Sequence, residues 1–149
     1  MKGEDYFAEL YVAGVFAKHG WNVYFPHRDQ GFDFIISKFI DDRVIIRPVQ
    51  VKGKYPERSK TDKRTYGYVG RLSQTHPDMV LAIPFFLPAT DLSSEKYIPR
   101  HTAYMPLNQI KRHKRGKRCE PAIFKNGEPL PKEKFLKFFD EEGIKLLES

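Results

Sequence analysis

The chain contains one cysteine, Cys119, among its 149 residues, so no disulfide can form within it. A lone cysteine is typical of a reducing compartment and favours a cytoplasmic location. Long apolar runs are also missing. The longest, residues 79–87, is interrupted by Pro84 and is far shorter than the ~20 residues that span a bilayer. No apolar stretch follows Lys2, so the start does not resemble a signal peptide. We therefore expect a cytoplasmic protein with no membrane partner.

The composition that is present fits a folded globular chain. Hydrophobic residues make up 40% of the sequence, with 12 Phe and 8 Tyr, which is enough for a hydrophobic core. A chain of this length buries one core without help from disulfides. The sequence shows no internal repeat and no linker composition, so we predict a single domain over residues 1–149.

Positive charge is concentrated in the middle of the chain. Residues 1–42 carry 4 basic and 7 acidic residues, giving −3, and residues 119–149 carry 5 and 7, giving −2. Residues 43–118 carry 17 basic and 5 acidic residues, giving +12. Such a block suits a polyanion, because each phosphate contact releases counterions. A basic patch on a membrane surface is the other interpretation, but no basic amphipathic helix supports it. Nucleic acid is therefore favoured.

Hydrophobic periodicity predicts alternating strands and helices. The first helix is apolar on nearly all sides and is expected to be sandwiched between other elements, and Asp41-Asp42 is expected to form the turn between the second and third strands. In chain order, the predicted elements are a helix over residues 4–19, strands over 22–25, 32–37 and 43–52, a long loop or irregular hairpin over 53–77, strands over 79–86 and 102–105, a helix over 106–114 and a last helix from Pro131. This order predicts an α/β fold with a mixed central β-sheet flanked by helices.

Three polar residues on two neighbouring predicted strands carry the candidate chemistry. Side chains alternate along a strand, so Gln50 and Lys52 face the same way while the valines beside them face the other. If the hairpin turns at residues 41–42, Asp33 pairs close to Gln50. Asp33, Gln50 and Lys52 then converge at one end of the sheet.

These residue types suit phosphodiester hydrolysis. A hard divalent cation takes oxygen ligands, which the Asp33 carboxylate and the Gln50 amide supply. Lys52 can orient or deprotonate a water that the metal activates. The alternative is that Gln50 and Lys52 are the solvent face of an ordinary half-buried strand. Asp33 lies inside an apolar run, where an unpaired carboxylate is costly, and that favours a ligand or a paired group.

A second acid lies on the predicted first helix. Glu9 shares one helix face with Val12, Ala13 and Phe16 by the i, i+3, i+4, i+7 rule. A carboxylate on an apolar stripe is either a further metal ligand or a peripheral acid paired with a lysine. The sequence leaves both interpretations open.

Together these residues resemble the PD-(D/E)XK nuclease superfamily, and in particular its small restriction, homing and junction-resolving members. The resemblance covers the first third of the chain and rests on Gly3, Glu9, Gly20-Trp21, Gly31-Phe32-Asp33 and Val49-Gln50-Val51-Lys52. It implies a restriction-endonuclease-like core and DNA cleavage that depends on Mg²⁺, with Mn²⁺ as a substitute. By position, Glu9 is the helix acid, Asp33 the metal-binding aspartate and Lys52 the catalytic lysine. Gln50 stands where the family usually has Glu or Asp, and Phe32 replaces the proline.

Two basic stretches are the predicted DNA contacts. Phosphate contacts fix position without reading sequence. The first stretch comprises Lys54, Arg58, Lys60, Lys63, Arg64 and Arg71, and the second comprises Lys111, Arg112, Lys114 and Arg115, followed by Lys117 and Arg118. The alternative is a solvated basic face that aids solubility.

The leading hypothesis is therefore a magnesium-dependent DNA endonuclease. Because cutting both strands usually needs two active sites, a homodimer or homotetramer is expected. The neutral Gln50 motivates a second hypothesis, a non-cutting DNA-binding module on the same fold. The third hypothesis is a structural protein whose basic patches bind an acidic protein.

Overall fold

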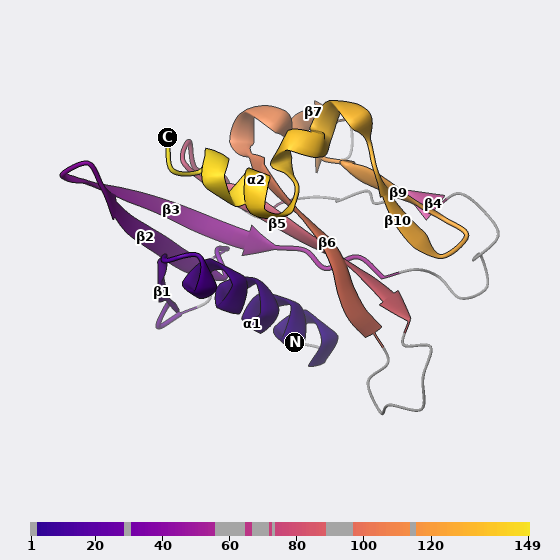
Figure 1. The fold of residues 1–149 in the computed structure, drawn as a ribbon, viewed down its shortest axis with the longest axis horizontal. Helices are drawn as coiled ribbons and strands as arrows, with labels where there is room; N and C mark the ends of the chain where they lie inside the picture. The colour runs from indigo at the N-terminus through magenta and orange to yellow at the C-terminus, as the bar shows by residue number, and fades with distance from the viewer. Residues whose placement is uncertain are drawn as a thin grey trace.

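The computed structural model describes residues 3–28, 31–55, 65–66, 72, 74–88, 97–113 and 116–149. The elements are α1 (Gly3–Lys18), β1 (Asn22–Tyr24), β2 (Phe34–Ile40), β3 (Arg43–Val51), β4 (Thr65–Tyr66), β5 (Val80–Pro88), β6 (Tyr97–Pro106), the 3-10 helix η2 (Leu107–Gln109), β7 (Lys111–His113), β8 (Gly116–Arg118), β9 (Ala122–Lys125), β10 (Glu128–Pro131), the 3-10 helix η3 (Glu133–Phe138) and α2 (Asp140–Leu146). The predicted fold class is confirmed at this level: a mixed α/β fold with a five-stranded mixed sheet flanked by helices (Figure 1).

The central sheet has the strand order β1-β2-β3-β5-β6. Neighbouring strands run antiparallel except β3 and β5, which are parallel, with Val49 opposite Val80. A smaller sheet has the order β10-β9-β4, and β7 and β8 form a separate two-stranded hairpin. In Figure 1 the tip of the β2–β3 hairpin forms one end of the molecule, and β9, β10 and β4 lie towards the other end.

The predicted turn between β2 and β3 is confirmed. Asp41 and Asp42 have φ angles of 50° and 62°, and two such residues give the tight turn whose twist matches that of paired strands. Short polar side chains such as Asp tolerate this left-handed backbone better than most. The turn fixes the register along the whole hairpin, from Ile40 opposite Arg43 to Phe34 opposite Val49.

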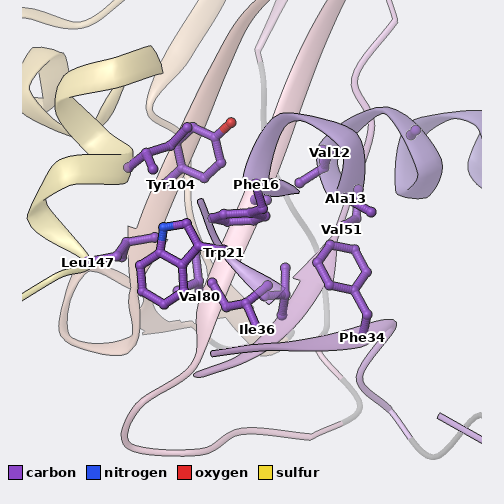
Figure 2. Packing of buried hydrophobic residues seen from close by; sticks show 14 of the residues in the cluster. Val12, Ala13, Phe16, Trp21, Phe34, Ile36, Val51, Val80, Tyr104 and Leu147 are labelled. Atoms are coloured by element: carbon purple, nitrogen blue, oxygen red, sulfur yellow. The ribbon is translucent and has the colours of Figure 1, made fainter. Parts of the chain in front are cut away.

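The first face of the sheet is covered by α1 and by the C-terminal helix. Val12 and Phe16 of α1 pack on Phe34 and Val49 of the sheet, and Leu147 closes the cluster from the other side (Figure 2). Trp21, Tyr104 and the strand residues Val51, Val80 and Ala82 complete this cluster. Burial of these large side chains supplies the main free energy that holds the helices on the sheet.

The prediction that α1 is sandwiched between layers is wrong. One side of the helix packs on the sheet, but Tyr6 and Leu10 are exposed, and Phe7 is partly exposed although its ring lies 5.8 Å from that of Phe86. The apolar residues all round the helix therefore reflect its composition, and the tertiary structure covers only one stripe of it.

The second face of the sheet is covered over β5 and β6. Leu81, Phe85 and Met105 form a second cluster with Phe124 from β9 and Phe138 from η3. Leu81, Phe85 and Met105 are completely buried, so the core extends to both sides of these two strands. The two hydrophobic clusters share the sheet as their common wall.

The predicted helix over residues 106–114 is wrong. The helical turn after Pro106 is only the three residues of η2, and Ile110 is already extended, with φ −102° and ψ 109°. The basic segment is instead the β7–β8 hairpin, with Lys111 opposite Arg118. Ile110 and Cys119, at the two ends of this hairpin, are both buried in the second cluster. A hairpin returns both of these residues to one place, which a continuing helix does not.

The C-terminal region differs from the prediction in two further ways. The β9–β10 hairpin was not predicted, although its turn is Asn126-Gly127, with φ angles of 54° and 79°. The last helix is divided at Phe139, which is extended and pairs with Ala103 of β6. The break lets Phe138 and Phe139 both enter the second cluster, whereas Ile144 of α2 enters the first.

Candidate functional site

Asp33 and Gln50 meet just before β2 begins. The Asp33 amide donates a hydrogen bond to Val49 O at 2.9 Å. The Asp33 Oδ2 atom accepts hydrogen bonds from the Val51 amide at 2.6 Å and from Gln50 Nε2 at 3.4 Å. The carboxylate thus takes the place of a backbone acceptor beside β3. The predicted pairing of Asp33 with the region of Gln50 is confirmed in this contact.

Gln50 and Lys52 point away from α1. Val49 and Val51 lie in the cluster beneath α1, so the residues that alternate with them face the second side of the sheet. After β3 the chain continues beside β5, because the Lys52 amide donates to Ala82 O and the Lys54 amide to Pro84 O. The alternation therefore extends to Lys54. We call Asp33, Gln50, Lys52 and Lys54 the polar row.

The two lysines of the polar row influence one another. Burial lowers the pKa of Lys54, and the neighbouring Lys52 ammonium lowers that pKa further. Both side chains are only partly exposed. Two ammonium groups close enough to interact make a local positive field, which suits a phosphate group. Lys54 is a member of the row that the sequence interpretation assigned to DNA contact alone.

The Gln50 side chain contains an unsatisfied oxygen. Gln50 is 8% exposed, and its Oε1 atom is buried without a hydrogen-bond partner among the described residues. A buried acceptor without a partner is costly, and natural structures usually supply one. A half-turn of the amide exchanges Nε2 and Oε1, which places an oxygen beside Asp33 Oδ2. Two oxygens side by side are the donor set of a hard cation.

The donor set has only one carboxylate. Among the residues that the structure describes, no group of three or more His, Cys, Asp or Glu is arranged to hold a metal. Mg²⁺ is nevertheless commonly bound through one or two protein carboxylates, with waters and substrate phosphates completing its octahedron. Asp33 and Gln50 therefore fit Mg²⁺ bound together with a phosphate better than a closed protein cage.

Glu9 lies on the other side of the sheet from the polar row. The Ala8 Cβ atom next to it is 3.2 Å from the position that a Cβ on Gly53 would occupy, so this turn of α1 is level with the end of β3. Glu9 is partly buried there. The helix packs on the face that holds Val49 and Val51, whereas Gln50 and Lys52 point to the opposite face. The direct contact among the predicted ligands is between Asp33 and Gln50, and it does not include Glu9.

The structure describes only part of the predicted DNA-binding set. Lys54 lies in the polar row, Lys111 is exposed at the start of β7, and Arg112 is the middle residue of β7. Arg112 stands opposite Lys117 in the β7–β8 hairpin. The remaining predicted contacts lie outside the described residues: Arg58, Lys60, Lys63, Arg64, Arg71, Lys114 and Arg115.

A further polar contact was missed by sequence reasoning. Asp140, with a φ of 56°, accepts a hydrogen bond from the Thr102 amide at 3.0 Å and pairs with His101 Nδ1 at 2.9 Å. This contact ties the start of α2 to β6. The two sides are 38 and 39 residues apart in the chain, and no local sequence pattern indicates that they meet.

Comparison of the chain with protein-family models, with curated proteins and with solved structures finds no match. The resemblance to the PD-(D/E)XK nucleases therefore rests on the residues named above and remains a prediction. In the described part of the chain, no helix combines the length and apolarity needed to cross a membrane.

Proposed function

We propose that the chain is a metal-dependent DNA endonuclease with a restriction-endonuclease-like PD-(D/E)XK core. The observation that carries the proposal is the Asp33–Gln50 contact, with an unsatisfied buried oxygen on Gln50 and with Lys52 next on the same face. Asp33 and Gln50 are the proposed ligands of Mg²⁺, with Mn²⁺ as a substitute. Glu9 is the remaining acid that the family resemblance assigns to the site.

Each residue of the polar row has a separate role in the proposed hydrolysis. Asp33 and Gln50 would hold the divalent cation, which would supply polarisation of the scissile phosphate and a lower pKa for a bound water. The Val51 amide holds the Asp33 carboxylate in place, so the carboxylate is preorganised as a ligand. Lys52 orients the attacking water and stabilises the negative charge that develops on the phosphate. Lys54 supplies a second cation next to it.

The basic hairpin supports a DNA substrate. Lys111 and Arg112 on β7 face Arg118 and Lys117 on β8 in the register of the two strands. A two-stranded ribbon has a width that the major groove of DNA admits. Basic residues paired along such a ribbon suit a phosphate backbone, and binding through them is expected to weaken steeply as the salt concentration rises.

The proposal is tested with variants that keep the local structure. In Asp33→Asn the side-chain oxygen still accepts the Val51 hydrogen bond, but the carboxylate charge is lost. Plasmid cleavage with Mg²⁺ is expected to fall by at least about 100-fold in Asp33→Asn and in Lys52→Gln, the range seen when one stabilising group of a catalytic centre is removed. Lys125→Gln, at an exposed position on β9, is the matched control and should keep full activity.

Metal binding gives a second readout that does not depend on cleavage. Titration of Mn²⁺ followed by electron paramagnetic resonance should show one bound ion for the wild type and none for Asp33→Asn at the same concentration. Equal cleavage by wild type and Asp33→Asn would mean that a contaminating enzyme caused the activity. If the wild type shows no cleavage and also binds no Mn²⁺, the nuclease is excluded.

The neutral Gln50 favours one second candidate, a DNA-binding module on the same fold that does not cut. Asp33 is the one carboxylate in the polar row, and a site with so little negative charge holds a cation weakly. Salt-dependent DNA binding together with no Mn²⁺ binding and no cleavage would support this candidate over the nuclease.

A further inference from the structure

On the second face of the β1–β2–β3 region, several apolar side chains are exposed in the part of the chain that the structure describes. The strand register places Tyr24 opposite Ile35 and Phe39 opposite Val44 on this face. Phe39 is 75% exposed and Ile46 is 57% exposed. We call the five exposed side chains on this face the hairpin face: Tyr24, Ile35, Phe39, Val44 and Ile46.

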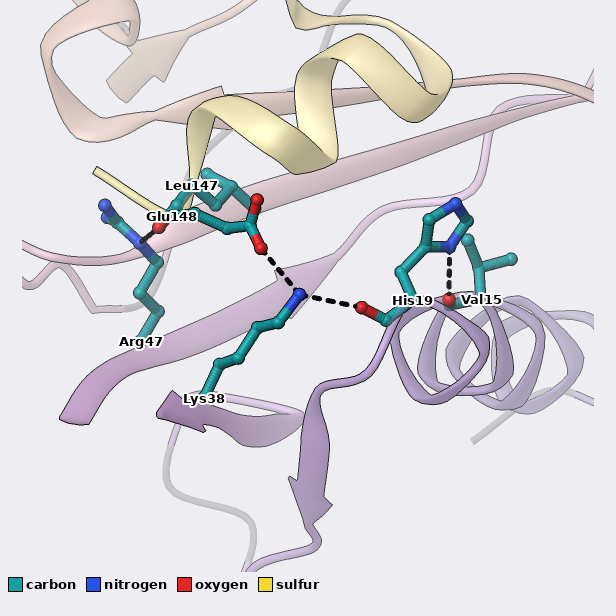
Figure 3. Close-up of polar contacts among 6 residues, drawn as sticks. All are labelled: Val15, His19, Lys38, Arg47, Leu147 and Glu148. Atoms are coloured by element: carbon teal, nitrogen blue, oxygen red, sulfur yellow. Dashed lines mark hydrogen bonds and ion pairs between the residues drawn. The ribbon is translucent and has the colours of Figure 1, made fainter. Parts of the chain in front are cut away.

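The charged side chains of the same hairpin point the other way. Lys38 donates to His19 O at 3.0 Å and pairs with Glu148 Oε1 at 2.6 Å (Figure 3). Arg47 donates to Leu147 O at 2.9 Å on the same side (Figure 3). An antiparallel sheet with one solvated face normally turns polar residues outward and apolar residues towards the core. In this hairpin part of that pattern is reversed, because charged residues lie on the packed face and apolar residues on the exposed face. The exposed face therefore has the character of a surface that a partner covers.

The hairpin face differs from the other exposed apolar surface of the protein. On α1 the exposed Phe7 and Leu10 share the helix surface with the exposed Asp5. Within the described strands β1 to β3, by contrast, no charged residue falls on the positions that alternate with Phe34 and Val49. The smallest of these residues, Ser37, is itself buried among its larger neighbours. An uncharged apolar patch is typical of an interaction site.

The area of the patch matches a dimer interface. Scaling the exposed fractions of its five side chains by ordinary side-chain areas gives roughly 500 Å² of apolar surface. A stable dimer buries about 800 Å² on each partner, of which about 65% is apolar in homodimers, and this corresponds to roughly 500 Å². The hairpin face therefore supplies the apolar core of one complete interface.

Symmetry favours a second copy of this chain as the partner, and the local absence of charge permits the contact. Each copy carries a net charge of +7, so two copies repel one another over most of their surface. The hairpin face has no charge to oppose the contact. A two-fold interface uses the same patch on both partners, which an uncharged apolar strand pair satisfies. We propose that two copies of the chain associate through their hairpin faces.

This arrangement also positions the polar row. Ile35 follows Asp33 by two residues, so the hairpin face and the polar row adjoin on the second face of the sheet. A second copy seated on the hairpin face lies next to the polar row of the first. This consequence rests on the proposed function: one centre from each copy then serves one strand of a duplex.

The test is the solution mass of the wild type and of three variants. Sedimentation equilibrium at micromolar concentration should give a dimer for the wild type. Phe39→Glu on β2 and Ile46→Glu on β3 should each weaken the dimer at least about 100-fold, because two like charges then meet in an apolar interface. Leu10→Glu, a similarly exposed apolar site on α1, is the matched control and should leave the dimer intact. Circular dichroism verifies that each variant is folded.

Three results would overturn the proposal: a monomeric wild type at micromolar concentration, a dimer that survives both hairpin substitutions, or dissociation by Leu10→Glu instead. The mass does not depend on metal or catalysis, so it separates this inference from the proposed nuclease. A wild-type dimer without nuclease activity would support the proposed interface and contradict the proposed enzyme. An active nuclease that is monomeric would do the reverse.

With both proposals correct, Phe39→Glu should convert double-strand cleavage of plasmid into single-strand nicking. Its Mn²⁺ affinity should remain within about threefold of the wild type, because the metal ligands are untouched.

Discussion

The two halves of the second sheet face have similar apolar character and different surroundings. Over β5 and β6, Leu81 and Phe85 are buried beneath Phe124 and Phe138, which the chain brings back from its C-terminal region. Over β1 to β3, Phe39 and Ile46 are exposed. The difference lies in where the chain returns and not in the strands themselves. An apolar strand face indicates a need for cover, and only the tertiary structure decides whether the chain supplies it.

The polar row lies along the border between these halves. Gln50 is opposite Leu81 of the covered half, and Asp33 is two residues from Ile35 of the bare half. A site at such a border has one dry wall and one open side. If the proposed function is correct, the dry wall would limit hydration of the metal ligands and the open side would admit a large substrate.

The largest effect is expected from emptying the covered half. Phe124→Ala removes a ring that packs at 5.7 Å, centroid to centroid, on Phe85 and should lower the free energy of unfolding by about 3–5 kcal/mol. Phe39→Ala should change it by less than about 0.5 kcal/mol in the monomer, since the side chain is exposed there. Urea denaturation at low protein concentration measures both. Similar losses would mean that the hairpin face is buried within the monomer.

The next effect is expected at the border. Gln50→Glu places a second carboxylate beside Asp33 in a site that is largely buried, and without metal it should cost about 1–3 kcal/mol of stability. Mg²⁺ should restore that loss, because it binds the folded state alone. Gln50→Leu has similar volume and should show no such recovery. Thermal unfolding in EDTA and in Mg²⁺ compares the two variants, and an unresponsive Gln50→Glu would argue against a cation here.

A smaller effect is expected at Cys119, which is buried in the second cluster and should make the free energy of unfolding depend on pH. Burial raises the pKa of this thiol from 9.0 to about 12. The unfolded state therefore loses its proton first as pH rises, and the free energy of unfolding falls between about pH 9 and pH 12. The fall from this one group approaches 1.4 kcal/mol per pH unit between about pH 10 and pH 11 and then ends as the folded-state thiol deprotonates.

Comparison of wild type with Cys119→Ala isolates the contribution of the thiol from that of the tyrosines and lysines. The pH dependence of the two unfolding free energies should diverge above pH 9 and be parallel below it. Parallel curves throughout would mean that the thiol is not held in the second cluster.

The smallest effect is expected on the first face. Lys38 and Glu148 form an ion pair at 2.6 Å with both side chains about one quarter exposed. Glu148→Gln should cost no more than about 1 kcal/mol, because solvent screens such a pair, and salt should reduce the difference further. Urea denaturation at low and high salt measures it. A larger loss would mean that this pair fixes the C-terminal segment against the hairpin.

The sequence predicted the first third of the fold well because its signals are local. Gly20 ends α1, with a φ of 88°, and Asp41-Asp42 sets the hairpin register that joins Asp33 to Gln50. The contact at the site followed from counting residues along two paired strands. Lys54 was undervalued because the chain keeps its strand alternation beyond Val51, where β3 formally ends.

The region after Pro106 was predicted poorly because its structure depends on distant partners. Pro106 at a first helical position favoured one helix to about Lys114, but burial of Ile110 and Cys119 in one cluster requires a hairpin. The Asn126-Gly127 turn was a readable local signal that was overlooked. The contact between His101 and Asp140 depends on the placement of α2 against β6, which local pattern does not encode.

The hydrogen bond from the Val51 amide to Asp33 Oδ2 links the main chain to the charge of the site. Any cation drawn to that oxygen competes with the amide proton for the same lone pairs. If a cation binds there, the exchange rate of the Val51 amide proton with deuterated water should rise. Nuclear magnetic resonance of the Val51 amide would therefore report on cation binding without any turnover of substrate.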